Sequence, residues 1–403
     1  MKKLIFLFFL STFFFQCKNT DSSSSAPREV KSYTIDQFLT NTNIYGRSFS
    51  HDEKELLAGS NETGIYNAYS INLESGERKP LTTSDDESVW VSSYFPHDNR
   101  FLYTSDNGGD EIDHIFLQNE DGTTKELTPD EGAKASFAGW SDDLKTFFYM
   151  YNKRDKKYMD MYEMDIENFQ STLIYKNEEG LDVGSMSNNK RYLALTKTIN
   201  TNDSDLFLFD RETKKMTKIN DTQSKNRPAD FSVDSKYLYF LTDAGNEFQY
   251  LMKYDIEAGT KEKSESEDWD ISYAYFSKKG KYQVIGINQD AKTVVKVKDT
   301  STGKLIDFPD LPNGDISSVR ISRSENKMIF SAGSSRSTNN LYYYDLQNKS
   351  LKQLTTTLNP EINPDDLVEA EVVRYPSFDK LEIPAIFYKP HTASSSNLSL
   401  IHI

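Results

Sequence analysis

A short phrase recurs along this chain at an interval of 45 or 46 residues. It begins with an aromatic or large apolar residue, usually followed by Ser, a polar pair often containing Asp, and then Lys or Arg before an apolar run. Its Ser position falls at residues 50, 141, 187, 232, 277 and 322, with Pro at 96. A fixed period of about 20–50 residues is the signature of solenoids, propellers and repeat arrays. The repeat therefore constrains the fold more than any other feature of the sequence.

Each repeat unit has room for four short strands. One strand follows the phrase, as at 237–241, a second ends in an acidic turn, as at 341–345, a third is rich in Lys, as at 352–355, and a fourth leads into the next phrase, as at 89–94. Turns containing Gly, such as Glu74-Ser75-Gly76, separate them. Four antiparallel strands in such a unit make one blade of a β-propeller.

Seven phrases predict an all-β, seven-bladed β-propeller of four-stranded antiparallel blades over residues 33–357. A solenoid is the alternative, but it requires capping repeats and units that are mostly helical or parallel. No helical period occurs in the units, and aromatic residues, at 13%, favour strands. Because each unit is built from consecutive chain, the predicted ring has no shared closing blade and is held at its seam by side-chain packing.

Residues 1–17 have the pattern of an export signal. Lys2 and Lys3 precede an apolar stretch of about a dozen residues, which is too short to span a bilayer as a helix of about 20 residues. Cys17, the only cysteine, lies at the expected cleavage point, and the pattern is similar to a bacterial lipoprotein signal, in which this cysteine is diacylated. The alternative is an ordinary secretory signal with an incidental cysteine.

These features predict a location as well as a domain order. The polar, Ser-rich segment 18–32 is expected to be a flexible tether. We therefore expect an exported protein, lipid-anchored through Cys17 in the bacterial cell envelope, either facing the periplasm or on the outer-membrane surface. The formal net charge of −15 repels phosphate backbones and argues against nucleic-acid binding. No cofactor is predicted.

The segment after the ring reads as the beginning of another domain, assigned here to residues 358–403. Two apolar strands near 368–375 and 381–390 flank the turn 376–380, which predicts a β-hairpin without a partner sheet. An unpaired apolar edge of this kind is a candidate surface for aggregation or partner binding.

Residues 33–403 resemble the N-terminal part of the prolyl oligopeptidase family, the S9 serine peptidases, including its dipeptidyl-peptidase and acylaminoacyl-peptidase branches. The resemblance lies in the opening 33–39, in the blade phrases, and above all in the hairpin, with Val373-Arg374-Tyr375 and Ile383-Pro384-Ala385. The blade phrases alone are also similar to the Tol-system translocation protein B. The family resemblance implies that an α/β-hydrolase domain begins at the hairpin.

The same resemblance implies where catalytic residues would lie. In the family, a strand leading to His-Gly-Gly precedes a Gly-x-Ser-x-Gly nucleophile turn, followed by Asp and His, and 398–402 with His402 resembles that strand. The sequence contains no Gly-x-Ser-x-Gly, and Gly59-Ser60-Asn61 and Gly333-Ser334-Ser335 are interpreted as turn residues. Acyl transfer needs an activated Ser and oxyanion donors. We therefore predict no catalytic residue in this chain and expect a fragment without peptidase activity.

Other candidate sites are weak. The histidines His51, His97, His114, His391 and His402 are too scattered to predict a metal site, although His51 and His97 occupy equivalent repeat positions and should lie on the same rim of neighbouring blades. Glu178-Glu179 is similar to the paired glutamates with which dipeptidyl-peptidases hold a substrate's amino terminus, but a solvated turn is the preferred interpretation. The acidic stretches 106–113 and 203–205 lack the spacing of a calcium loop.

Two functions remain open from the sequence. The first is the substrate-gating propeller of a secreted S9-type peptidase that cleaves oligopeptides. The second is a lipid-anchored stand-alone propeller that binds a protein or glycan partner at a membrane. A third possibility, a hydrolase or lyase with its active site in the propeller funnel, has no group of residues to support it.

Overall fold

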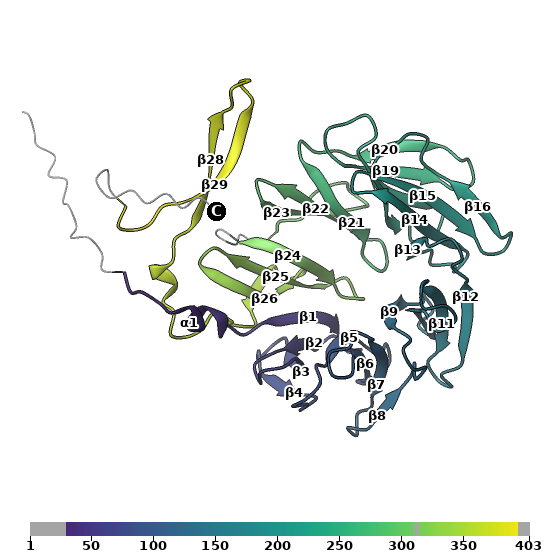
Figure 1. Cartoon of the computed structure of the whole chain (residues 1–403), viewed down its shortest axis with the longest axis horizontal. Coiled ribbons are helices and arrows are strands. Elements are labelled where there is room, and N and C mark those ends of the chain that lie inside the picture. Colours follow the sequence, from purple (N-terminus) through teal and green to yellow (C-terminus); the bar gives the residue numbers. More distant parts are fainter. Residues whose placement is uncertain (1–29, 309–310, 312–313, 394–403) are drawn as a thin grey trace, which may run out of the picture. The chain divides into compact units, whose positions relative to one another are not determined.

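Seven small antiparallel sheets follow one another along the chain and are arranged around a common centre (Figure 1). The computed structural model describes residues 30–308, 311 and 314–393, and Tyr33–Lys389 form one compact unit. Each sheet consists of consecutive strands, so no sheet combines strands from the two ends of the ring. The predicted seven-bladed all-β propeller without a shared closing blade is confirmed.

The blades are built from the following strands. The first three are β1 (Ile44–Phe49), β2 (Glu55–Ser60), β3 (Asn67–Asn72) and β4 (Arg78–Pro80); β5 (Trp90–Tyr94), β6 (Phe101–Ser105), β7 (His114–Gln118) and β8 (Thr124–Glu126); and β9 (Ala135–Trp140), β10 (Thr146–Tyr151), β11 (Asp160–Asp165) and β12 (Ser171–Tyr175). The fourth and fifth are β13 (Asp182–Met186), β14 (Tyr192–Asn200), β15 (Asp203–Asp210) and β16 (Lys215–Lys218); and β17 (Asn226–Phe231), β18 (Tyr237–Thr242), β19 (Tyr250–Asp255) and β20 (Lys261–Glu265). The last two are β21 (Asp270–Phe276), β22 (Tyr282–Gln289) and β23 (Lys292–Asp299); and β24 (Asp315–Ile321), β25 (Lys327–Ser334), β26 (Ser337–Asp345) and β27 (Ser350–Gln353).

The sixth blade departs from the four-stranded pattern. It has three strands, β21 to β23, and its outer edge is continued by an isolated antiparallel bridge between Lys298 and Leu305. The other six blades have the predicted four strands.

The hydrophobic core is divided among the seven blade interfaces. Each of seven apolar clusters joins one blade to the next, because alternate residues of a strand point to opposite faces of its sheet. Leu102, for example, packs toward the third blade, whereas its neighbours Phe101 and Tyr103 pack toward the first. Burial on both faces explains why the central strands read as continuous apolar runs rather than alternating ones.

The recurring phrase is a tight turn between the first and second strands of a blade. In five blades the Ser hydroxyl accepts the backbone N–H five residues later, as in Ser187 with Tyr192 at 2.9 Å and Ser277 with Tyr282 at 2.8 Å. The residue three positions after the Ser is left-handed, with φ of 59° at Lys190 and 64° at Glu325. The Ser and the polar pair are therefore required by turn geometry. We call the face of the ring that carries these turns the phrase face.

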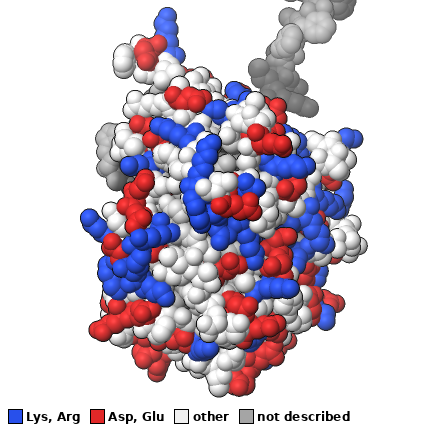
Figure 2. Space-filling view, turned by 90° about the vertical axis from the view of Figure 1, so that its right-hand side faces the viewer, with Lys and Arg blue, Asp and Glu red and all other residues white. Residues whose placement is uncertain are grey.

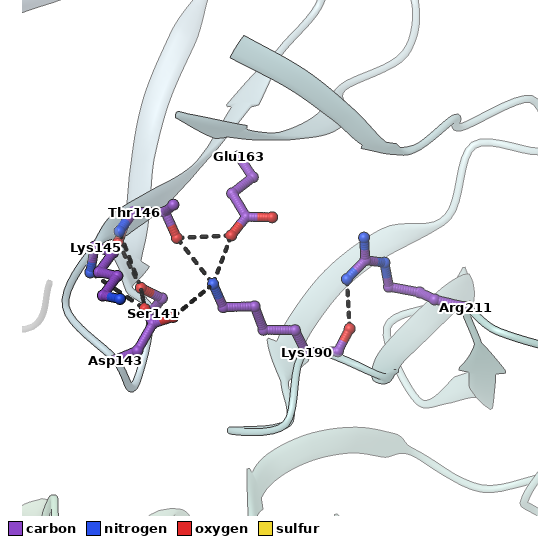
Figure 3. A network of polar contacts seen from close by, with 7 residues as sticks. All are labelled: Ser141, Asp143, Lys145, Thr146, Glu163, Lys190 and Arg211. Atoms are coloured by element: carbon purple, nitrogen blue, oxygen red, sulfur yellow. Dashed lines mark hydrogen bonds and ion pairs between the residues drawn. The ribbon is translucent and has the colours of Figure 1, made fainter. Parts of the chain in front are cut away.

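The left-handed residue of a phrase also contacts the phrase of the preceding blade. Lys190 Nζ lies 2.8 Å from Glu163 Oε1 and 3.2 Å from Thr146 Oγ1 of the third blade, and Arg211 donates to the Lys190 carbonyl oxygen (Figure 3). Glu325 accepts the Ser277 hydroxyl at 2.5 Å and the Lys279 N–H at 2.8 Å. In these two turns the left-handed residue thus connects units about 45 residues apart.

The seam between the seventh and first blades is held, like the other blade interfaces, by a buried apolar cluster, and it also has a polar contact from a left-handed phrase residue. Ile44, Leu56 and Ile71 pack against Ile329, Leu341 and Leu354 in one buried cluster. Glu53, the left-handed residue of the first phrase, accepts the Ser324 N–H at 2.6 Å. The predicted closure by side-chain packing is therefore confirmed, with polar contacts added on the phrase face.

Two short helices and a hairpin complete the structure. Helix α1 (Ile35–Leu39) begins with a capping box between Thr34 and Gln37, and the 3₁₀ helix η1 is Pro364–Asp366. The hairpin of β28 (Ala370–Pro376) and β29 (Glu382–Tyr388) turns through left-handed Lys380, as predicted. No helix of the described residues is long and apolar enough to cross a membrane. Cys17, the predicted signal peptide and most of the predicted tether lie outside the described residues.

Candidate functional site

The first strand of each blade lines the centre of the ring. One cavity of about 630 Å³ is bounded by residues of β1, β5, β9 and β24, strands of four different blades, and by the phrase of the sixth blade. Strands separated by more than 200 residues can share one cavity only if they converge at the ring centre. We call this space the central cavity; it lies at the phrase face.

All seven first strands contain a β-bulge next to this centre. In β1 the register shifts between Gly46 and Ser48, so Arg47 has no cross-strand partner and its side chain is exposed within the cavity wall. A bulge redirects side chains and strengthens the local twist. The bulges therefore decide which residues face the centre.

The central cavity is strongly basic. Its charged lining consists of Arg47, Lys278, Lys279, Arg320 and Arg323 together with one carboxylate, Glu53, and His51 also lies in its wall. Burial, and after it the charge of Arg47, lowers the pKa of Arg320, and burial lowers the pKa of Arg323. On the outer face in Figure 2, by contrast, basic and acidic side chains are interspersed. The cavity thus differs in charge from a protein whose net charge is −15.

A smaller cavity of about 450 Å³ shares Arg320 and Ile321 with the central cavity. Tyr273 and Tyr275 form its wall; the Tyr275 hydroxyl donates to the Val319 carbonyl oxygen at 2.7 Å, whereas the buried Tyr273 hydroxyl has no hydrogen-bond partner. Burial raises the pKa of Tyr273 to about 12, so it stays a neutral donor.

A third cavity, of about 710 Å³, lies where the hairpin approaches the ring. It is lined by the β22–β23 and β25–β26 connections, including Asp290 and Ser335, and by hairpin residues such as Val372 and Tyr388. Arg374 of the hairpin donates to both carboxylate oxygens of Asp290 at 2.7 and 2.8 Å. This charged pair ties the hairpin to the sixth blade.

The structure places the histidines apart. His51 Nδ1 lies 3.2 Å from Asn99 Oδ1, which puts the first and second phrases on one rim, as predicted for His51 and His97. His114 pairs with Glu126 across two strands of the second blade. Within the residues described, no three His, Cys, Asp or Glu side chains are grouped so that they could hold a metal ion. His402 lies outside those residues.

The acidic candidates lie in turns. Glu178 and Glu179 are exposed in the connection between β12 and β13, where no helix forms, and Glu178 pairs with Lys176 at 2.5 Å. Asp110 accepts backbone N–H groups within its own loop, and Asp205 pairs with Lys218 at 2.7 Å. The two glutamates thus lie in an exposed turn, the interpretation preferred from the sequence.

The serine candidates also belong to strand ends. Ser60 is the last residue of β2 and Ser334 the last of β25, and Ser335 follows in the turn to β26. A nucleophile turn connects a strand to a helix. The interpretation of the two triplets as turn residues was therefore wrong for Gly59, Ser60, Gly333 and Ser334, which lie in strands, and holds only for Asn61 and Ser335.

Sequence reasoning missed the basic central cavity. The signal was present, because Arg47 and Arg320 lie two or three residues before the Ser of their phrases, in the first strands. Strand alternation could not assign their direction, since the bulges interrupt it.

Comparisons with known proteins agree with this architecture. Residues 80–357 match the sequence model of the prolyl oligopeptidase N-terminal β-propeller domain. Dipeptidyl aminopeptidase BIII of Pseudoxanthomonas mexicana is 25% identical over 218 residues, which cover 52% of this chain and 31% of that protein.

Solved structures show the same fold. Prolyl oligopeptidase B from Galerina marginata superposes with a TM-score of 0.65 at 14% identity, over 89% of this chain and 57% of that one. A prolyl endopeptidase gives a TM-score of 0.64 at 15% identity, over 85% and 54%. The chain thus spans about a third of the curated relative and just over half of these structures. Since the family model covers most of the ring, this chain belongs to the prolyl oligopeptidase family and contains its N-terminal β-propeller.

Proposed function

We propose that this propeller is the substrate-gating portion of an exported serine peptidase that cleaves oligopeptides. The observation that carries the proposal is the family match over 80–357, combined with a ring whose centre contains a confined cavity. A closed ring held by seven buried interfaces opens only at a cost in free energy. Short or unfolded peptides would pass such a centre, whereas folded proteins would not.

We propose further that the catalytic residues lie outside this sequence. Peptide hydrolysis by this chemistry needs a Ser activated by a base and donors for the oxyanion. The 403 residues contain no Gly-x-Ser-x-Gly turn. On its own, this chain is therefore expected not to hydrolyse peptides.

The gene provides the first test. Translation downstream of codon 403 in all frames should reveal His-Gly-Gly, then Gly-x-Ser-x-Gly, and later Asp and His. If several hundred codons lack them, the alternative of a lipid-anchored binding module for a protein or glycan takes precedence.

Enzymology provides the second test. The purified chain should not cleave blocked fluorogenic peptides, whereas a product that includes the downstream residues should cleave short peptides and spare folded proteins. Turnover by the chain itself that survives purification controls would refute the assignment of catalysis to other residues. Equal cleavage of folded and short substrates would refute gating.

Export and anchoring through Cys17 belong to the same proposal. The signal-like pattern at 1–17 supports it. Metabolic labelling with a radioactive fatty acid should mark the wild-type protein and not Cys17→Ser, and only the wild type should sediment with membranes. Equal labelling of both would contradict a lipid anchor on this residue.

A further inference from the structure

The central cavity concentrates positive charge without a matching set of carboxylates. Five basic side chains and one carboxylate line it. Three of these groups are already engaged: Lys278 pairs with Asp142 at 3.0 Å, Arg323 donates to the Pro96 carbonyl oxygen at 3.3 Å, and Glu53 accepts from Ser324 at 2.6 Å. The basic side chains that remain are Arg47, Lys279 and Arg320, of which the two arginines have the planar donor groups that match a carboxylate.

Arg47 and Arg320 have no carboxylate partner. Among the residues that the structure describes, neither forms an ion pair, and Arg47 instead lies 5.0 Å from the centre of the Tyr45 ring. They come from the first strands of adjacent blades, on either side of the seam, and burial together with the weaker effect of the Arg47 charge lowers the pKa of Arg320. Two guanidinium groups that line one cavity without carboxylate partners favour an anion between them, because charge-assisted hydrogen bonds to a carboxylate are stronger than neutral ones.

The neighbouring aromatic wall indicates what accompanies the anion. Arg320 belongs to both cavities, and Tyr273 and Tyr275 line the smaller one. A ligand with a carboxylate at the two arginines and a backbone or side chain against the tyrosines would satisfy both. A peptide has this combination, since it can carry a carboxylate and pack its side chains against the tyrosine rings.

We propose that Arg47 and Arg320 form a carboxylate-binding site that selects acidic peptides, or peptide carboxyl termini, at the phrase face of the ring. Guanidinium forks match the geometry of carboxylates in a way that lysine does not. The peptide nature of the ligand depends on the proposed function, whereas recognition of the carboxylate depends only on the cavity. The site would then bias which oligopeptides enter the ring.

The test is direct binding to the full chain, measured by titration calorimetry with three short peptides of one length. The first is blocked at both ends with a central glutamate, the second replaces it with glutamine, and the third has glutamine and a free carboxyl terminus. We expect the first or the third to bind at least tenfold more tightly than the second, as estimated from the strength of charged hydrogen bonds. Which of the two binds identifies the source of the carboxylate.

Four variants, one of them a control, complete the design. Arg320→Gln and Arg47→Gln should each weaken the preferred peptide by roughly tenfold to a hundredfold, and Arg320→Lys should retain part of the affinity. The control, Lys215→Gln, removes the same charge from the outer strand β16 and should change binding less than twofold. Equal affinity for all three peptides, or equal losses in the control, would overturn the proposal. Circular dichroism of each variant distinguishes a loss of binding from misfolding. Because the assay measures binding and needs no catalysis, its result is independent of whether the proposed peptidase function is correct.

Discussion

Removal of the Glu325 carboxylate should weaken the interface between the sixth and seventh blades. Glu325 is 4% exposed and accepts the Ser277 hydroxyl at 2.5 Å, the Lys279 N–H at 2.8 Å and the Lys281 N–H at 3.3 Å. Glu325→Ala leaves at least two of these donors without an acceptor, at roughly 1–3 kcal/mol each. The free energy of unfolding should therefore fall by about 2–5 kcal/mol.

The measurement is urea denaturation followed by tryptophan fluorescence. Glu325→Gln keeps one acceptor oxygen and should lose about half as much as Glu325→Ala. Glu257→Ala, in an exposed turn, serves as the control and should stay within about 0.5 kcal/mol of the wild type. Residue 325 has a left-handed backbone. Because Ala and Gln both have a Cβ atom, this backbone strains the two variants at position 325 equally, and their difference in stability reports the lost hydrogen bonds. If Glu325→Ala and the control behave alike, the idea that phrase residues join the blades is wrong.

Two further predictions concern pH and the hairpin. Burial raises the pKa of Asp230 to about 6, so the folded state binds a proton on this carboxyl more tightly than the unfolded chain does. The protonated carboxyl therefore contributes its full stabilisation below about pH 4, and this stabilisation is lost as the pH rises through 6. Asp230→Asn should therefore gain stability relative to wild type between pH 4 and 8, by up to about 3 kcal/mol in paired denaturation curves; a flat difference would contradict a raised pKa. Limited proteolysis should cut first at the hairpin turn, where Phe378 is 100% exposed, and first cuts within the blades would contradict this order.

The sequence was sufficient for the architecture because a propeller repeats one local pattern. The phrase positions predicted seven units, and strands such as β6 and β18 begin at the residues expected from them. The consecutive order of strands within each unit also predicted the closure at the seam. The reduced fourth strand of the sixth blade was not predicted, although the segment near Leu305 lacks the Leu-Thr ending of the first, second and seventh units and contains Pro309 and Pro312.

What the sequence did not reveal depends on contacts between repeats. The partner of Glu325 is Ser277, 48 residues earlier, and no local rule connects them. The bulge at Arg47 places a charged side chain in the cavity against simple alternation. Helix α1, by contrast, could have been found, because Thr34 and Gln37 have the spacing of a capping box.

A double-mutant cycle across the seam tests the closed ring most directly. Leu56 of the first blade and Leu341 of the seventh belong to one buried cluster, and both approach Gly46. Leu56→Ala, Leu341→Ala and the double variant should show a coupling energy of about 1 kcal/mol or more, because each deletion enlarges a shared cavity. Additivity within about 0.3–0.5 kcal/mol would mean that the two residues do not touch, and the ring would not be closed in the way described.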